Sequence, residues 1–314
     1  MIKKLRVGTR GSRLALWQAE YVVSLLGRYF PDIDFETVVI KTQGDKILDV
    51  ALSKIGDKGL FTKEIEIALL DNQIDMAVHS MKDLPTQLPE GIEIGAVLER
   101  ENPRDVLVSH RGYSLAELPP GARVGTSSLR RISQLRAVRP DLELVNLRGN
   151  VETRIRKMKT EGMDAIILAY AGVKRMGYLE EVTDLLSSAV MLPAVGQGAI
   201  GIEIRQGDTA VAEKVKTIHH EASGTEVTAE RAFMRRLEGG CQVPIACQAR
   251  AADEELIIDG LVASLDGKSV FRSQLRGQPG QAEELGKMLA AQVLTMGADT
   301  VLEEIRRWGE QSNE

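Results

Sequence analysis

The sequence predicts an α/β protein with two alternating domains, followed by a small α+β domain. Strand-like and helix-like segments alternate twice between Leu5 and Ile204, whereas the remainder of the chain does not alternate. A chain of 314 residues is also too long for a single ordinary core. We therefore expect three units, each able to bury its own apolar side chains.

The first alternation predicts strands and helices in turn, up to a polar segment at 100–104. Apolar β-branched runs favour strands, and apolar residues repeated every three or four positions favour helices. Strands are expected at 5–8, 35–40, 74–78 and 92–98, with helices at about 12–28 and 62–70. The segment 100–104 is charged and contains Pro103, which is typical of a hinge.

The second alternation begins at Asp105 and predicts another α/β domain. Strands are expected at 105–108, 122–125, 142–145 and 165–168, with helices at 128–138 and after Asn150. The run 199–204 is strand-like and is expected to return to the first domain. The first domain would then be 1–99 with 200–217, the second 105–193, and the hinges 100–104 and 194–199.

The third unit, 222–314, is expected to be a small α+β domain. A helix at about 225–237 precedes strands at 256–262 and 269–275, and a helical pattern covers about 281–308. The dipeptide Asp266-Gly267 between the two strands is typical of a hairpin turn.

Cys241 follows Gly239 and Gly240 and precedes Pro244, so its thiol is expected on a loop. A thiol in that position can carry a covalent group. A lone cysteine can equally be a small buried apolar side chain, and the loop alone does not decide between the two. Cys247, which begins a strand leading to Ala251, is interpreted as packing.

Composition narrows the class of protein. Hydrophobic residues make up 43% and charged residues 27%, as in globular proteins, and the net charge of -5 argues against a general nucleic-acid binder. Two cysteines and four scattered histidines predict neither a disulfide framework nor a metal site. Neither a signal-peptide core nor a stretch long enough to cross a bilayer is evident, so we expect a cytoplasmic protein without membrane or nucleic-acid partners.

Two segments share one sequence pattern. In each, a predicted strand is followed by Gly-Thr, a serine, arginine and then a predicted helix. The first contains Arg10 and Ser12, and the second contains Thr126, Ser128 and the pair Arg130 and Arg131. A single occurrence is explained by helix capping, but hydroxyls, helix amides and arginine together also suit a carboxylate or phosphate. Two occurrences favour facing anion sites and a cleft for a polyanion.

Further polar and cationic residues follow predicted strands, where open α/β sheets bind ligands. A lone lysine there can simply be solvated, whereas arginines suit bidentate contacts with carboxylates. These residues are Lys54, Lys58, Lys82, Arg148, Asn150, Arg154 and Arg175.

Asp83 follows the predicted strand 74–78 and precedes Leu84 and Pro85. It is a candidate acid or base, although an Asp-Leu-Pro sequence can also merely start a turn. The glycine pattern 196–201 matches the dinucleotide-binding fingerprint in letters only, because a strand rather than a helix is expected to follow it. We therefore do not expect a nucleotide site there.

Several segments occur together and in order as they do in one enzyme family, so the chain resembles the porphobilinogen deaminases, also called hydroxymethylbilane synthases. The resemblance spans nearly the whole length. The segments are 7–13, 41–45, 79–85, 125–131, 147–154, 192–198 and 237–245.

The resemblance implies two type II periplasmic-binding-protein-like α/β domains and a third domain whose cysteine, here Cys241, carries a dipyrromethane cofactor through a thioether. It implies a transferase that deaminates porphobilinogen, joins four units head to tail on the cofactor, and releases hydroxymethylbilane by hydrolysis. Asp83 matches the catalytic aspartate. We also expect a monomer.

The resemblance also assigns the polar residues either to the cofactor or to the substrate. Besides Cys241, the cofactor would be held by Lys82, Asp83, Thr126, Ser128, Arg130 and Arg131. Incoming substrate would be bound by Arg10, Ser12, Arg148, Asn150, Arg154 and Arg175. Because every pyrrole carries an acetate and a propionate, clustered arginines on an acidic protein suit this chemistry.

Two other classes remain possible from the residues alone. A non-catalytic polycarboxylate-binding module of the periplasmic type would need neither Asp83 nor the cysteine domain. A thiol enzyme would need a histidine or second cysteine beside Cys241, and no nearby histidine or Cys-x-x-Cys occurs in the sequence.

Overall fold

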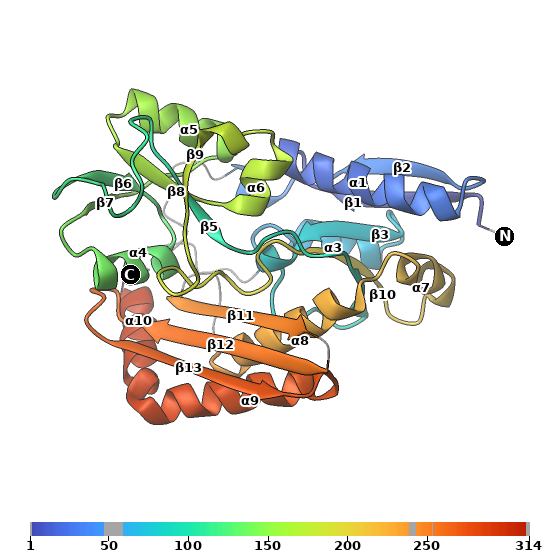
Figure 1. Cartoon of the computed structure of the whole chain (residues 1–314). Helices are drawn as coiled ribbons and strands as arrows, with labels where there is room; N and C mark the ends of the chain where they lie inside the picture. The colour runs from blue at the N-terminus through green and yellow to red at the C-terminus, as the bar shows by residue number, and fades with distance from the viewer. Residues whose placement is uncertain (1, 47–58, 239–242, 253, 312–314) are drawn as a thin grey trace. The chain divides into compact units, whose positions relative to one another are not determined.

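The computed structural model describes residues 2–46, 59–238, 243–252 and 254–311 (Figure 1). These residues fall into two units. The first comprises those within Met1–Leu48, Asp57–Glu101 and Ala199–Thr225, and the second comprises those within Asn102–Gly198 and Glu226–Glu314.

The first unit contains a five-stranded sheet in the order β2-β1-β3-β10-β4. Its strands are β1 (Lys4–Thr9), β2 (Asp34–Val39), β3 (Met76–Ser80), β4 (Ile92–Val97) and β10 (Ile200–Arg205). β1 pairs in parallel with β2 and β3, whereas β10 runs antiparallel between β3 and β4. The prediction that 199–204 returns to the first sheet is confirmed, and a strand rather than a helix follows the glycine pattern at 196–201.

Helices pack on this sheet because their apolar residues recur on one face. α1 buries Ala19, Val22 and Leu26 against the strands, and α3 buries Ile65 and Leu69 in a neighbouring cluster. The helices of this unit are α1 (Arg13–Tyr29), α2 (Gln43–Lys46), α3 (Lys63–Leu70) and α7 (Thr209–Lys216), with a 3-10 turn, η2 (Met81–Asp83). The predicted helices at 12–28 and 62–70 are confirmed.

The second unit contains a sheet of the same plan, in the order β7-β6-β8-β5-β9. β6 corresponds to β1, β8 to β3, and β5, which is antiparallel to both its neighbours, corresponds to β10. The strands are β5 (Asp105–Val108), β6 (Arg123–Gly125), β7 (Glu143–Val145), β8 (Ala165–Ala169) and β9 (Val182–Leu185). The helical elements are α4 (Leu129–Val138), α5 (Val151–Thr160), α6 (Tyr170–Arg175) and η3 (Leu179–Glu181).

The C-terminal residues of this unit form an antiparallel sheet, β11-β12-β13, with helices packed on one face (Figure 1). Its core joins Phe233, Ile258, Leu289 and Leu302. Gly286 allows close packing, because a Cβ there would lie 2.2 Å from the Ala229 carbonyl oxygen. The elements are α8 (Glu221–Arg236), β11 (Ile245–Ala252), β12 (Glu255–Ala263), β13 (Val270–Gly277), η4 (Pro279–Gln281), α9 (Ala282–Val293), the π turn η5 (Leu294–Ala298) and α10 (Asp299–Gln311).

The helical pattern predicted for 281–308 is confirmed by α9, η5 and α10, although one residue in it is not helical. Gly297 has a φ of 110°, a conformation closed to a helix, and it separates α9 from α10. The hairpin predicted at Asp266-Gly267 lies between β12 and β13, and Gly267 takes a φ of 75° there. The interpretation of Cys247 as packing is confirmed, since it is fully buried in β11.

Hydrogen bonds join the small sheet and α8 to the segment that follows β9. Arg272 on β13 donates to the carbonyl oxygens of Ser188 and Ala189, at 3.0 Å each, while its side chain also pairs with Asp259. Glu230 on α8 is fully buried and accepts from the backbone amides of Gly196 and Ala249. The predicted boundary between these parts stays a prediction.

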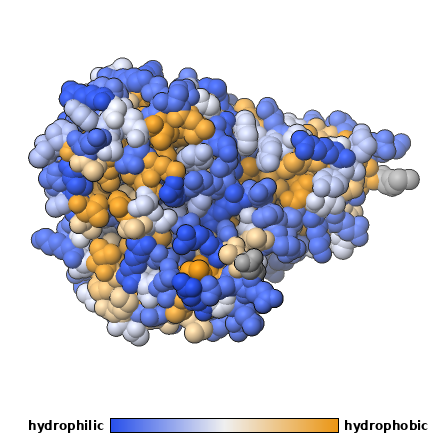
Figure 2. All heavy atoms as spheres, in the orientation of Figure 1, coloured by the Kyte–Doolittle hydropathy of each residue, from blue (hydrophilic) through white to orange (hydrophobic). Residues whose placement is uncertain are grey.

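Apolar groups on the face drawn in Figure 2 are interrupted by hydrophilic residues. The exposed large apolar side chains are scattered along the chain, including Val39 on β2, Val138 on α4 and Met288 on α9. Scattered exposure of this kind is normal for folded proteins and does not by itself indicate a docking surface.

Candidate active site and anion-binding residues

Asp83 lies at the end of η2, directly after the buried strand β3. The backbone holds this turn in place, because the Met81 amide donates to the Ala199 carbonyl and the Leu84 amide donates to the Met81 carbonyl. Lys82 is half-buried in the same turn. The Asp83 carboxylate therefore belongs to a turn fixed to the centre of the first sheet.

Asp83 lines a pocket in the first unit. Most of its lining side chains are polar or charged, and the others are apolar. Its lining residues are Arg10, Ser12, Leu14, Ala15, Gln18, Phe61, Thr62, Val78, His79, Ser80 and Asp83.

Arg10 and Ser12, from the first of the two segments that share the Gly-Thr pattern, both line this pocket. The Arg10 guanidinium lies 4.1 Å from the centre of the Phe61 ring, a cation–π distance. Ser12 is the N-cap of α1 and accepts a hydrogen bond from the Ala15 amide at 3.3 Å. The structure thus brings a cation, a hydroxyl and the Asp83 carboxylate together.

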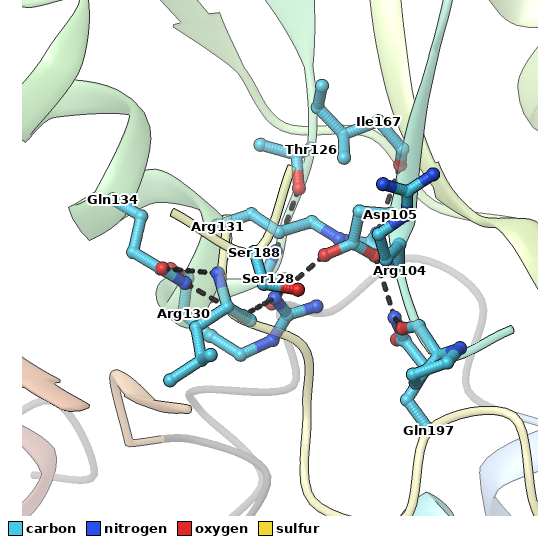
Figure 3. Close-up of polar contacts among 12 residues, drawn as sticks. Arg104, Asp105, Thr126, Ser128, Arg130, Arg131, Gln134, Ile167, Ser188 and Gln197 are labelled. Atoms are coloured by element: carbon cyan, nitrogen blue, oxygen red, sulfur yellow. Dashed lines mark hydrogen bonds and ion pairs between the residues drawn. The ribbon is translucent and has the colours of Figure 1, made fainter. Parts of the chain in front are cut away.

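The second unit places Arg130 and Arg131 in a buried cluster around Asp105 (Figure 3). Nη1 of Arg130 and Nη2 of Arg131 each lie 2.7 Å from an oxygen of Asp105. Burial alone would raise the pKa of Asp105, but the two guanidinium charges hold it well below its ordinary range. Asp105 is therefore an anion shared by both arginines.

Backbone carbonyls fix the rest of this cluster. Arg130 donates to the Leu192 carbonyl at 2.7 Å, and Arg131 donates to the Ile167 carbonyl at 3.0 Å. Gln197 donates to Asp105 at 3.0 Å and to the Pro103 carbonyl at 2.6 Å. Residues from both predicted hinges thus meet at Asp105.

The Arg130–Arg131–Asp105 cluster retains capacity for an anion. Two guanidinium groups and one carboxylate leave one net positive charge, and Nε of Arg131 is buried without a hydrogen-bond partner among the described residues. An unpaired buried donor is unfavourable, by about 1–3 kcal/mol. The net positive charge of the cluster favours a nearby carboxylate.

Thr126 and Ser128 differ from their counterparts in the first unit. Thr126 is buried and accepts a hydrogen bond from the Ser128 amide at 3.3 Å. Ser128 stands at the N-cap position of α4, but its side chain makes no capping hydrogen bond. The capping expected from the repeat is confirmed at Ser12 and wrong at Ser128.

The other predicted binding residues lie in the second unit. Asn150 caps α5 by accepting from the Thr153 amide at 2.8 Å, and Arg154 donates to the Gly149 carbonyl at 2.7 Å. Arg175 on α6 donates to the Gly198 carbonyl at 2.7 Å, and burial lowers the pKa of Arg148. Asn150 and Arg154 come together at the start of α5.

Three predicted residues, Cys241, Lys54 and Lys58, lie outside the described residues. Among the residues that the structure describes, no group of three or more His, Cys, Asp or Glu side chains is arranged to hold a metal ion. In the same part of the chain, no helix is long and apolar enough to span a membrane.

Sequence reasoning missed Asp105 and the polar groups around it. Asp105 opens a predicted strand, where an acidic residue usually faces solvent, and the sequence does not show that β5 lies beside β8. The available signal was its place directly after a hinge, together with the two adjacent arginines that need an anion.

The chain has two α/β sheets with the same strand order and a small C-terminal α+β part. It therefore belongs to the class of proteins with two type II periplasmic-binding-protein-like α/β domains. The chain belongs to the porphobilinogen deaminase family. Residues 5–213 match its dipyrromethane cofactor binding domain, and residues 224–295 match its C-terminal domain.

Curated relatives agree over nearly the whole length. A porphobilinogen deaminase from Carboxydothermus hydrogenoformans is 57% identical over 307 residues, which cover 98% of this chain and 99% of the relative. Another, from Syntrophomonas wolfei, is 58% identical over 306 residues, covering 98% and 100%. These relatives give no support to the alternative of a non-catalytic binding module.

Among solved structures, a probable amino-acid ABC transporter extracellular-binding protein from Bacillus subtilis is similar at a TM-score of 0.42 and 10% identity, covering 69% of this chain and 90% of that one. The aliphatic sulphonate binding protein from Escherichia coli is similar at 0.40 and 15%, covering 76% and 71%.

Proposed function

We propose that Asp83 is the catalytic residue of this deaminase and that the Arg130–Arg131–Asp105 cluster holds a carboxylate of its dipyrromethane cofactor. The overall activity is that of the family. The enzyme joins four porphobilinogen molecules head to tail with loss of ammonia, on a covalent dipyrromethane, and then releases hydroxymethylbilane by hydrolysis.

The observation that carries the proposal is the meeting of Asp83, Arg10 and Ser12 in one pocket. Loss of ammonia from porphobilinogen leaves an electron-poor methylene pyrrolenine. A fixed carboxylate can accept the pyrrole N–H and stabilise the positive charge that develops. Arg10 and Ser12 supply donors for the substrate's acetate and propionate, and Phe61 holds the Arg10 fork against its ring.

The residues of the second unit fit the cofactor. The cluster keeps one positive charge and a buried, unsatisfied Nε of Arg131, and the Ser128 side chain is not engaged in capping. A net positive charge and a hydroxyl that is not engaged in capping suit the carboxylates that a dipyrromethane carries. When bound, that group supplies the free pyrrole carbon to which the first substrate unit is joined.

We assign the remaining residues as the family resemblance suggests. Cys241 carries the cofactor, and Lys82 and Asp83 of the first unit and Thr126 of the second contribute to holding it. Arg148, Asn150, Arg154 and Arg175 bind substrate or the growing chain. We further propose a monomeric, cytoplasmic enzyme without nucleic-acid or membrane partners, in keeping with its net charge of -5.

Intact mass and turnover test these assignments together. The purified chain should exceed its sequence mass by a dipyrrole, and Cys241→Ala should remove that excess. Asp83→Asn should keep the excess mass but lower turnover on the order of 100-fold or more, because it removes charge while nearly conserving shape. Asp32→Asn, at an exposed position, is the matched control.

Two results would contradict the assignments. Active wild-type protein without the added mass would contradict the assignment of Cys241. Near-normal hydroxymethylbilane formation by Asp83→Asn would contradict the catalytic role of Asp83.

A further inference from the structure

Three titratable side chains lie buried behind the Asp83 pocket, and the mechanism above uses none of them. His79 on β3 is 5% exposed, Glu203 on β10 is 0% exposed, and Glu66 on α3 is 5% exposed. Nε2 of His79 lies 3.0 Å from Oε2 of Glu203. His79 also lines the pocket, so this buried triad adjoins the site directly.

Four polar atoms of the triad lack hydrogen-bond partners. Nε2 of His79, both carboxylate oxygens of Glu203 and Oε1 of Glu66 make no hydrogen bond among the described residues. In that part of the chain, no lysine or arginine lies at ion-pair distance from either carboxylate. Two isolated buried carboxylates would be strongly unfavourable, so protons must balance their charge.

Two protons make the triad electrically neutral. Burial, and then the negative charge of Glu203, raise the pKa of Glu66, which favours its neutral acid form. The remaining proton belongs to the His79–Glu203 pair, whose 3.0 Å contact suits an imidazolium and a carboxylate. Among the described residues that line the pocket with His79, the other charged side chains are Arg10 and Asp83.

We propose that Glu203 holds His79 as an imidazolium in the wall of the Asp83 pocket, with Glu66 as the neutral member of the triad. Glu203 is then a positioning residue, because it acts on the pocket through His79. The triad as a whole is neutral, but it places the positive end of the His79–Glu203 pair, the imidazolium ring, in the wall of the pocket, where it is complementary to Asp83 and to carboxylated substrate. This role rests on the proposed function of Asp83.

Histidine NMR of the holoenzyme measures the charge of His79 directly. The chain has only four histidines, so His79→Asn assigns the resonance. If that variant does not fold, substitution of His110, His219 and His220 assigns it by exclusion. At pH 7.5 we expect the chemical shifts of a protonated ring in the wild type and in Glu66→Gln, and of a neutral ring in Glu203→Gln.

The NMR result can overturn the proposal without reference to activity. A neutral His79 ring in the wild type would do so, and so would a protonated ring that persists in Glu203→Gln. Because this measurement does not involve catalysis by Asp83, it can fail or succeed independently of the proposed function.

Kinetics then test the positioning role. Glu203→Gln should lower kcat on the order of 10-fold with a smaller change in KM, because the wall of the pocket loses its fixed charge. Each single substitution leaves one member of the pair without its partner. The double variant His79→Asn with Glu203→Gln should therefore have a kcat no lower than that of the slower single variant. Glu93→Gln, at an exposed position on the neighbouring strand β4, is the control.

If the losses in kcat of the two single variants simply added in the double variant, the coupling between His79 and Glu203 would be overturned. Unchanged kcat in Glu203→Gln would overturn its effect on the site, even if the NMR result stands.

Discussion

Oδ2 of Asp105 lies 2.7 Å from Nη1 of Arg130. Its other oxygen lies at the same distance from Arg131, so one carboxylate fixes two arginines that the family resemblance assigns to the cofactor. The arginines are thereby held in place before any ligand binds, and only one of their two charges is left for it. Preorganised donors of this kind bind an anion with little reorganisation.

Replacing Asp105 with asparagine should destabilise the protein strongly. The change leaves two buried guanidinium groups without their anion, and breaking such a pair costs about 3–5 kcal/mol. Urea unfolding of the holoenzyme measures the effect. Asp141→Asn, in the more exposed pair with Arg139, is the control and should leave the midpoint nearly unchanged. Equal effects of the two substitutions would contradict the role of Asp105.

Ser12 and Ser128 should differ when each is replaced with alanine. Ser12→Ala removes a helix cap and should lower the free energy of unfolding by about 1 kcal/mol. Ser128→Ala removes no capping bond, so we expect little change in stability but a smaller fraction of the purified chain that has acquired the cofactor. Thermal unfolding and intact mass measure the two effects. A larger loss of stability at Ser128 would refute this distinction.

Arg10→Lys should raise KM for porphobilinogen on the order of 10-fold. Lysine keeps the charge but loses both the bidentate fork and the stacking on Phe61. Steady-state kinetics measure the change, with Arg28→Lys at an exposed position on α1 as the control. An unchanged KM would contradict the assignment of Arg10 to substrate binding.

Glu66→Gln should alter how stability depends on pH. The folded protein raises the pKa of Glu66 above its ordinary value of 4.5. The wild type therefore loses stability relative to Glu66→Gln as pH rises from that value through the folded pKa. Unfolding free energies of both proteins between pH 4 and pH 8 measure the difference. A difference that stays constant with pH would contradict a buried, titrating Glu66.

The sequence predicts most of the α/β plan because periodicity reports burial locally. It identified β10 as a returning strand from its apolar run, and it identified Arg10, Ser12 and Asp83 from their places after strands. It missed β9, α6 and α7, which are short. The helical pattern at 281–308 did not reveal the break between α9 and α10, because a glycine in such a pattern does not show that its φ is positive.

The buried acids could not be found in the same way. Glu203 and Asp105 sit in strands whose neighbours come from distant parts of the chain, β3 and β8. Their partners depend on which strands pair, and that information is in the tertiary structure. Cys241 was identified from its loop and the family resemblance, and the described residues do not test it.

The position of β10 has a consequence for synthesis on the ribosome. Chains emerge from the N-terminus, yet the first sheet has its fourth position, between β3 and β4, filled by Ile200–Arg205. The second sheet needs nothing beyond Leu185. Of the two α/β sheets, the one that begins first is therefore completed second, and until Arg205 emerges, the facing edges of β3 and β4 remain open to wrong partners such as a neighbouring nascent chain.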